Sequence, residues 1–330
     1  MFKIDEDLIS QRPAVSVHTI GGSGDEPFLK DLENNILADC PSIEYIDNSG
    51  MDISFTPSSF LSILLVLAEE TDDQQQLIQY LEKVRANSSL TVAFVPVGSS
   101  KNRQYRSSVA GNDSNRYQKL QWLEKIRTTV DTLVLLKEDR QEVDTTIVGA
   151  VPLLLNGSTC IGIDFADIRY ILTGMESERA HGIFIAGSET LTDAENPECN
   201  AIRLGTRLLS IAGRPLQCCL GCLDYAKYYK LSLGGAVEVH EKVCNTACIN
   251  DAASAFSMVV RSDVALCTDS KLMYIAGQLD LTKATLDRIM NHEQSHALCL
   301  SSHPHQRTDS RSYETIGAVP DKESTGKTQV

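Results

Sequence analysis

Three residues near the end of the sequence match the ligand and base pattern of a zinc protease. His292, Glu293 and His296 form an HExxH motif, in which two imidazoles one helical turn apart bind Zn²⁺ and the glutamate acts as general base. The residues around the motif are polar, and His303 lies one residue away from the position that a third ligand would need. Adventitious metal binding is therefore the simpler interpretation of these histidines. We rank a zinc metalloprotease third among three hypotheses for the function of the chain.

Cysteine spacing allows a second metal-site hypothesis. Cys219 and Cys222 form a CxxC pair and Cys244 and Cys248 a CxxxC pair, which a structural zinc site could use. However, residues 217–223 have the pattern of a buried strand, in which alternate side chains point to opposite faces. We expect the ten cysteines of the chain to be reduced, and those in this strand to act as small apolar residues. We predict no metal site.

The hydrophobic pattern alternates between strand and helix over the first half of the chain. The expected strands span residues 14–20, 43–46, 60–67, 90–95 and 132–136, and the expected helices 27–38, 74–85, 117–129 and 144–155, with a polar loop at 98–114. This alternation predicts an α/β fold with a parallel sheet and helices on both faces. From residue 183 to 279 we expect strands with fewer helices between them, which is typical of a mixed α+β domain. The polar sequence after 282 predicts a disordered tail.

Segments in the same order along the chain resemble FtsZ, the bacterial relative of tubulin. Residues 130–136 (VDTLVLL), followed by Asp139-Arg140, are similar to the family's strand that ends in an Asn-Asp-Arg turn. Residues 163–168 (IDFADI) resemble its synergy loop, Asn-x-Asp-Phe-Ala-Asp-Val, and residues 271–277 (KLMYIAG) resemble its last core strand. The resemblance spans roughly residues 14–279.

This resemblance implies the tubulin/FtsZ-like α/β fold, with a Rossmann-like parallel-sheet N-terminal domain, a connecting central helix and an α+β C-terminal domain. The expected boundaries are 1–140 for a degenerate nucleotide-binding domain, 141–160 for the central helix, 161–280 for the C-terminal domain with the synergy loop, and 281–330 for the tail.

The resemblance also implies a GTP site that is only partly preserved. The matching positions are Gly21, Gly22, Gly24, Asn48, Asp139, Arg140 and Asp144. The family's glycine-rich phosphate loop is replaced at 68–73 by AEETDD, which has no glycine and four carboxylates. Like charges about 4 Å apart repel by roughly 4 kcal/mol at an effective dielectric constant of about 20, so this loop opposes a triphosphate. We interpret the site as vestigial and expect no cofactor. GTP or GDP with Mg²⁺ is expected only if the loop has been rebuilt around a metal.

In the synergy loop, Asp164 and Asp167 match the carboxylates that act on the nucleotide of a neighbouring subunit. Their spacing places both on nearly the same side of a first helical turn. The resemblance implies a catalytic role for them in trans. The structural alternative is that Asp164 caps the following helix, as aspartate commonly does.

The charge balance restricts the partners. The net charge of −14 excludes nucleic acid and an anionic membrane as main partners, because both require an excess of Lys and Arg. The acidic N-terminal residues lack the order of a signal peptide, and no apolar run would span a bilayer, so we expect a cytoplasmic protein. The sequence favours an FtsZ-like pseudo-GTPase that regulates or caps filaments in cell division or a related cytoskeletal process. Its expected partner is FtsZ or another tubulin-like subunit, possibly a second copy of itself. The alternative is a divergent active GTPase that polymerises.

Overall fold

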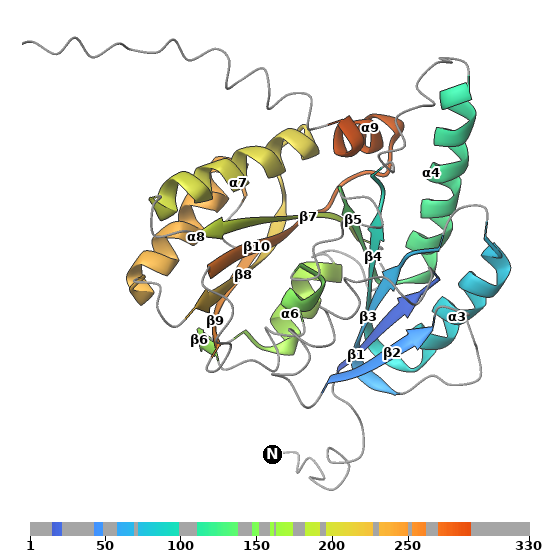
Figure 1. Cartoon of the computed structure of the whole chain (residues 1–330), viewed down its shortest axis with the longest axis horizontal. Coiled ribbons are helices and arrows are strands. Elements are labelled where there is room, and N and C mark those ends of the chain that lie inside the picture. Colours follow the sequence, from blue (N-terminus) through green and yellow to red (C-terminus); the bar gives the residue numbers. More distant parts are fainter. Residues whose placement is uncertain are drawn as a thin grey trace, which may run out of the picture. The chain divides into compact units, whose positions relative to one another are not determined.

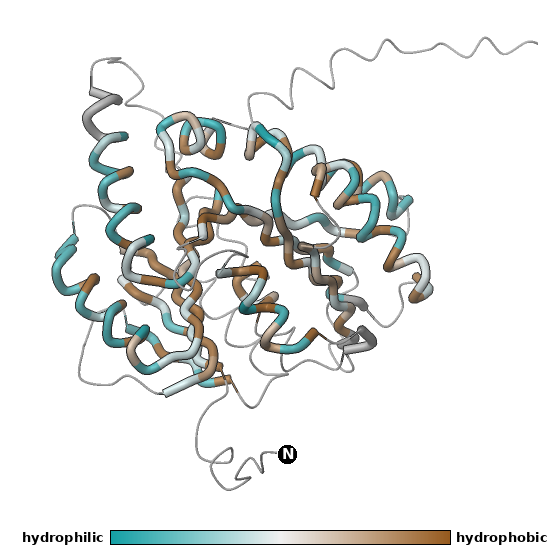
Figure 2. The backbone as a smooth tube through the Cα atoms, turned by 180° about the vertical axis from the view of Figure 1, so that it is seen from behind, coloured by the Kyte–Doolittle hydropathy of each residue, from teal (hydrophilic) through white to brown (hydrophobic). Residues whose placement is uncertain are grey.

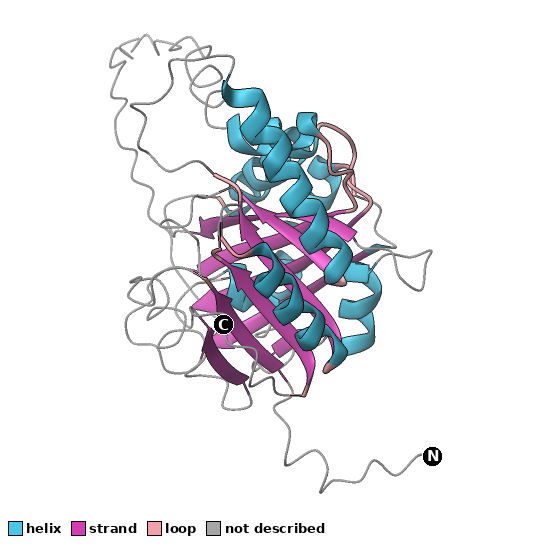
Figure 3. Ribbon diagram, turned by 90° about the vertical axis from the view of Figure 1, so that its right-hand side faces the viewer, coloured by secondary structure: helices cyan, strands magenta, loops and turns pink. Residues whose placement is uncertain are grey.

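Ten strands in the described part of the chain form one sheet, in the order β2-β1-β3-β4-β5-β7-β10-β8-β9-β6 (Figure 1). The computed structural model describes residues 15–21, 43–48, 58–68, 72–98, 111–137, 147–151, 159–161, 163–173, 182–191, 196–226, 231–249, 253–261 and 270–291. The ribbon in Figure 3 shows these strands as one twisted sheet against which the helices pack.

The parallel half of the sheet comprises β1 to β5 and continues into β7. Its strands are β1 (Val15–Ile20), β2 (Ile43–Asn48), β3 (Ser59–Val66), β4 (Ser88–Pro96) and β5 (Thr132–Leu136). β1 pairs in parallel with both β2 and β3, and β5 pairs in parallel with β7 (Gly182–Leu191). β3, β4 and β5 are almost entirely buried, which explains their nearly continuous apolar sequences. The predicted parallel sheet is confirmed.

The second half of the sheet is mixed. Its strands are β6 (Thr159–Ile161), β8 (Cys218–Ala226), β9 (Ser254–Arg261) and β10 (Ser270–Gly277). β10 runs antiparallel to both β7 and β8, whereas β8 and β9 are parallel. The backbone hydrogen bonds therefore continue from the predicted N-terminal part into the predicted C-terminal part through β7.

Two groups of helices cover the two faces of the sheet. One face carries α3 (Gln74–Ala86), α4 (Gly111–Thr129), α7 (Pro197–Ala212), α8 (Leu233–Ala247) and α9 (Lys283–Asn291). The other face carries α6 (Phe165–Thr173) and the helical residues 147–151. Seen from behind, the strands form the hydrophobic centre, while teal and brown alternate along the surrounding helices (Figure 2). None of the helices in the described ranges has the length and apolarity that crossing a bilayer requires.

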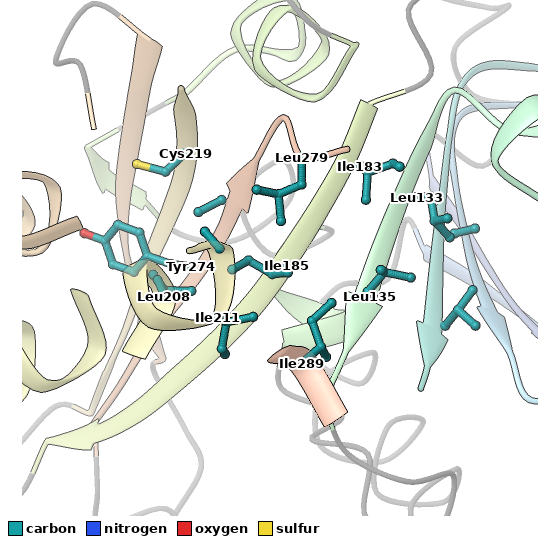
Figure 4. Close-up of a cluster of buried hydrophobic side chains, with 14 of the residues drawn as sticks. Leu133, Leu135, Ile183, Ile185, Leu208, Ile211, Cys219, Tyr274, Leu279 and Ile289 are labelled. Carbon is teal, nitrogen blue, oxygen red and sulfur yellow. The ribbon is translucent and has the colours of Figure 1, made fainter. Parts of the chain in front are cut away.

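The hydrophobic core on the α3–α9 face runs without interruption under both halves of the sheet. Figure 4 shows Leu133 and Leu135 of β5 near Ile183 and Ile185 of β7, with Ile289 of α9 alongside. All five side chains are buried. Because one core serves strands from both predicted domains, the two halves bury their apolar surface jointly.

The structure contains more helix than we predicted in the second half. α7 and α8 lie where we expected few helices between the strands. Both carry recognisable end signals: Asn196 caps α7, Pro197 occupies its first turn, and Gly213 ends it in a left-handed conformation with φ 69°. Ser232 caps α8, and its Oγ accepts a hydrogen bond from Gly235 N.

Two element boundaries also differ from the prediction. α4 begins at Gly111, inside the segment predicted as a loop. α9 occupies the first residues of the predicted tail, because Leu286 and Ile289 supply a buried apolar stripe and Thr282 accepts a hydrogen bond from Thr285 N at the start of the helix. The predicted helix at 27–38 and the residues from 292 onward lie outside the described ranges.

Candidate functional site

The carboxyl ends of β1, β2 and β3 form the edge where an α/β sheet of this kind binds ligands. In the sheet, β2 lies on one side of β1 and β3 lies on the other side. The direction in which successive strands are added therefore reverses between β1 and β3. A reversal of this kind opens a crevice beyond the strand ends. Gly21 follows β1 there with φ 72°, and its N–H donates to the carbonyl of Asn48 at 3.4 Å. Two of the predicted nucleotide-binding residues, Gly21 and Asn48, are thus brought together.

The backbone at this edge is packed against itself. The N–H groups of Leu67 and Ala68 both donate to the carbonyl of Ile20, at 2.8 and 3.1 Å. A Cβ atom on Gly21 would lie 2.7 Å from Ala68 N, closer than side chains approach a backbone. The first two amides after β3 are therefore already hydrogen-bonded to the sheet, where a phosphate loop would direct its amides at a ligand.

The N-terminus of α3 is occupied by a carboxylate of the chain itself. Asp73 is the N-cap residue, and its Oδ1 accepts hydrogen bonds from Gln75 N at 3.0 Å and Gln76 N at 3.1 Å. The positive end of a helix attracts an anion through such N–H groups and its dipole. In this chain the anion is Asp73, and a phosphate would have to displace it.

A buried polar network leads inward from Asn48. The Asn48 side chain is hydrogen-bonded to Tyr80 of α3, whose hydroxyl lies 2.6 Å from Nδ1 of His18. Nε2 of His18 lies 2.8 Å from Oγ of Ser16, which begins a cluster of hydroxyls with Ser62 and its neighbours. Burial lowers the pKa of His18 to about 4 and raises the pKa of Tyr80 to about 12, so both side chains are neutral at pH 7.

This network was not predicted from the sequence. His18 and Ser16 alternate with apolar residues in β1, a pattern that marks them as belonging to one face. Nothing in the sequence indicates that Tyr80, sixty-two residues later, supplies the matching partner to His18. At the candidate site, the side chain of Asn48 is therefore positioned by its hydrogen bond to buried Tyr80.

Asp164 and Asp167 lie at the opposite edge of the parallel strands. Phe165, between them, packs edge-on against Phe60 at the amino end of β3, with ring centroids 6.3 Å apart. Phe60 is 57% exposed, and both aspartates are exposed beside it. The six residue-to-residue steps from Phe60 to Val66 span about 20 Å at 3.3 Å per step. These carboxylates therefore cannot reach the Gly21 edge of their own chain, and any action on a nucleotide would be on a neighbour.

Asp164 has the helix-capping role that was weighed as the structural alternative. Its Oδ1 accepts a hydrogen bond from Asp167 N at 2.8 Å, and its carbonyl accepts one from Ile168 N at 3.2 Å. Capping uses one carboxylate oxygen and leaves both side chains at the surface, so capping and contact with a partner are compatible.

Substitution of Asp164 separates these two roles. We expect Asp164→Ala to lower the free energy of unfolding by about 1 kcal/mol, because the capping oxygen is lost. Asp164→Asn retains an oxygen that can accept the bond from Asp167 N, so its stability should remain within a few tenths of a kcal/mol of the parent. Urea unfolding followed by circular dichroism measures both. Equal losses in the two variants would contradict the capping role.

The remaining predicted nucleotide residues, Gly22, Gly24, Asp139, Arg140 and Asp144, lie outside the described ranges, as does the HExxH motif at 292–296. The two-pair zinc site is not formed. Cys219 and Cys222 belong to the cores on opposite faces of the sheet, as strand alternation predicted. Within the described segments, no group of three or more His, Cys, Asp or Glu side chains is placed to hold a metal ion.

A parallel half joined through β7 to a mixed half, with helices on both faces, defines the α/β fold class of FtsZ and its tubulin-like relatives, and the chain has this fold over most of its length. In particular, it is similar to an FtsZ dimer from M. jannaschii, described as empty, at 14% identity over 86% of this chain and 96% of that one, with a TM-score of 0.59.

Two further solved structures share the fold. CetZ from Methanosaeta thermophila matches at 10% identity, covering 87% of this chain and 94% of its own, with a TM-score of 0.53. CetZ2 from Haloferax volcanii, in a protofilament with GTPγS bound, matches at 9% identity over 87% and 100% of the two chains, with a TM-score of 0.51. No protein-family model and no curated protein matches the sequence. The likeness establishes the fold, and the function must be argued from the site.

Proposed function

We propose that this chain is an FtsZ-like pseudo-GTPase that regulates or caps tubulin/FtsZ-type filaments through protein contact, in cell division or a related cytoskeletal process. Its partner would be FtsZ or another tubulin-like subunit in the cytoplasm, or a second copy of the chain. The observation that carries the proposal is the capping of α3 by Asp73, at the position where a nucleotide-binding relative would receive phosphate.

Three features support the loss of nucleotide binding. The Asp73 carboxylate occupies the N–H groups at the start of α3, and the amides of Leu67 and Ala68 are bonded to Ile20. The second carboxylate in this described stretch, Asp72, adds negative charge next to the cap. A triphosphate would have to break the internal bonds and approach like charge at the same time.

The separation of the two edges supports a subunit with one functional face. Asp164 and Asp167 stand beside exposed Phe60 at the amino ends of the strands, which gives that edge both apolar area and charge for a partner. At the other edge, within the part of the chain that the structure describes, the amides after β3 and at the start of α3 are bonded inside the chain, which opposes a nucleotide between subunits. A subunit of this kind would join a filament through the Asp164 edge and leave no competent site for the next subunit.

The first test is calorimetry of Mg·GTP titrated into the purified chain, together with an assay of the nucleotide released on denaturation. We expect neither binding heat nor retained nucleotide, because the phosphate position is internally occupied. CetZ2 from Haloferax volcanii, whose protofilament structure has GTPγS bound, serves as the binding control when treated identically. Stoichiometric binding would reject the pseudo-GTPase and favour the divergent active GTPase, with the acidic loop as its metal site.

The second test concerns the Asp164 edge. Substoichiometric wild-type chain should reduce the FtsZ polymer that sediments in the presence of GTP, as a cap does. Asp164→Asn with Asp167→Asn should abolish this effect while the cap of α6 is retained. The matched control is Glu238→Gln with Glu241→Gln, which removes two exposed charges from α8, away from this edge. Loss of the effect in both double variants would indicate a general charge effect, and retention in both would exclude the Asp164 edge.

A further inference from the structure

Two cysteines from different elements touch each other beneath α8. Sγ of Cys219, in β8, lies 3.8 Å from Sγ of Cys244, in α8. Both residues are buried, at 0% and 1% exposure. A disulfide requires about 2.05 Å between the sulfur atoms, so closure by about 1.8 Å would join them. The two side chains already point toward one another across a helix–sheet interface.

A histidine connects this pair to the protein surface. His240, one turn before Cys244 on α8, places its Nε2 3.6 Å and its Nδ1 3.8 Å from the Cys244 sulfur. The same Nδ1 lies 2.7 Å from the hydroxyl of Tyr274. The imidazole stacks on Phe256 with ring centroids 4.8 Å apart. His240 is only partly buried, whereas Tyr274 is fully buried, so the imidazole is the part of this cluster that solvent can reach.

The surroundings of Cys244 favour its thiolate. Its pKa is lowered, chiefly by the hydrogen bond with Cys219 and also by His240, while burial acts in the opposite direction. Burial raises the pKa of Tyr274 well above its usual value, so the phenol remains protonated and can donate to Nδ1 of His240. Cys218, one residue from Cys219 but on the other face of the sheet, has its pKa raised to about 12 by burial. The thiolate is the reactive form of cysteine, so Cys244 differs chemically from Cys218, the sequence neighbour of its partner Cys219.

We propose that Cys219 and Cys244 are a modification site, a dithiol that a small two-electron oxidant such as hydrogen peroxide converts reversibly into a disulfide between β8 and α8. The Cys244 thiolate attacks one peroxide oxygen, the O–O bond breaks, and the departing hydroxide takes a proton to become water. The Cys244 sulfenic acid that forms is attacked by the Cys219 sulfur, which displaces hydroxide and forms the S–S bond. The displaced hydroxide takes up the proton of Cys219 as water. In total, two thiols lose two electrons and two protons, and peroxide is reduced to two waters.

Strand alternation explains why only Cys219 of the three cysteines in β8 can take part. Cys218 and Cys222 contribute to the core on the α6 side, whereas Cys219 contributes to the core under α8. Cys248, at the end of α8, is exposed in a left-handed cap with φ 56°. Figure 4 shows Cys219 on the same side of the sheet as Tyr274. Of the cysteines in β8 and α8, the interface therefore places Cys219 against Cys244.

The test oxidises the folded full chain with hydrogen peroxide, quenches with catalase, blocks remaining thiols with N-ethylmaleimide and maps tryptic peptides without reduction. We expect residues 208–227 to be linked to residues 243–261. Cys219→Ala and Cys244→Ala should each abolish this link, whereas Cys218→Ala, Cys222→Ala and Cys248→Ala should retain it. Dithiothreitol should reverse it. The alanine variants are checked for folding by circular dichroism before oxidation.

Three outcomes would overturn the proposal. The first is absence of the link at a peroxide dose that fully oxidises the exposed Cys199. The second is persistence of the link in folded Cys219→Ala, since the bond would then come from another cysteine. A repeat in guanidinium chloride gives the unfolded reference, in which links should spread over several cysteine pairs. The same mixture of links from the native chain would mean that oxidation follows unfolding, and would also reject the site.

Discussion

Replacement of Gly21 by valine should destabilise the chain by about 3 kcal/mol. Gly21 has φ 72°, in the left-handed region that costs a residue with a side chain about 1–2 kcal/mol. A Cβ atom there would also lie 2.7–2.8 Å from the N, Cα and Cβ atoms of Ala68, and the first two are backbone that cannot rotate away. Overpacking of this kind typically costs about 1–3 kcal/mol in addition. Urea denaturation at constant pH measures the loss.

Gly234 provides the matched control for this substitution. It lies in the first turn of α8, and a Cβ atom there would meet only Ser232 Oγ at 3.9 Å. Gly234→Ala should therefore be neutral or slightly stabilising, because alanine favours the helix. Equal stability of Gly21→Val and Gly234→Ala would contradict the close packing of Gly21 on Ala68. The edge at the carboxyl ends of the strands would then have room for a ligand, and nucleotide binding there would be reconsidered.

His18 should make the folded chain sensitive to acid between pH 6.5 and 4. Its pKa is lowered by burial from the ordinary 6.5 to about 4, so in this range the unfolded chain binds a proton that the folded chain does not. The stabilisation by neutral His18 is complete above pH 6.5 and is lost as the pH falls toward 4. The pKa difference corresponds to about 3 kcal/mol.

The variant His18→Gln isolates this effect. Glutamine has a donor and an acceptor for Tyr80 and Ser16 and does not titrate, so the variant should be about 3 kcal/mol less sensitive than the parent to the change from pH 7 to 4. Denaturant midpoints at several pH values give the comparison. NMR titration of the histidine rings provides an independent check, since the signal absent from the variant should remain that of a neutral imidazole until about pH 4. Parallel pH profiles for the two proteins would refute the assignment.

The sequence was sufficient to predict the buried strands, because strands buried on both faces have almost continuously apolar sequences. β3, β4 and β5 are apolar almost throughout, and their predicted positions agree with the structure within a few residues. Amphipathic helices were harder to recognise. α9 has only a narrow buried stripe, including Leu286 and Ile289, within polar sequence, and tertiary contact with α7 and the sheet determines that it folds.

Only part of the candidate site could be predicted from the sequence. The acidic composition of residues 68–73 indicated that this loop would repel phosphate. The hydrogen bonds that Asp73 accepts from Gln75 N and Gln76 N, however, depend on where α3 begins. A closer reading of Asp73 followed by Gln76 as a capping box would have located it. The contacts of Asn48 with Tyr80 and of Phe60 with Phe165 join distant segments, and no local pattern specifies them.

The pairing of β7 with both β5 and β10 determines how mechanical force passes through the sheet. Among the described strands, a continuous ladder of backbone hydrogen bonds crosses the middle of the sheet and joins its two halves. A torque applied to one half passes directly to the other, and the halves can rotate relative to one another only by changing the twist of the whole sheet. Such a deformation is elastic and shared among many bonds. The ten described strands therefore act together as one stiff sheet, and a load applied at one edge strand is transmitted to the other.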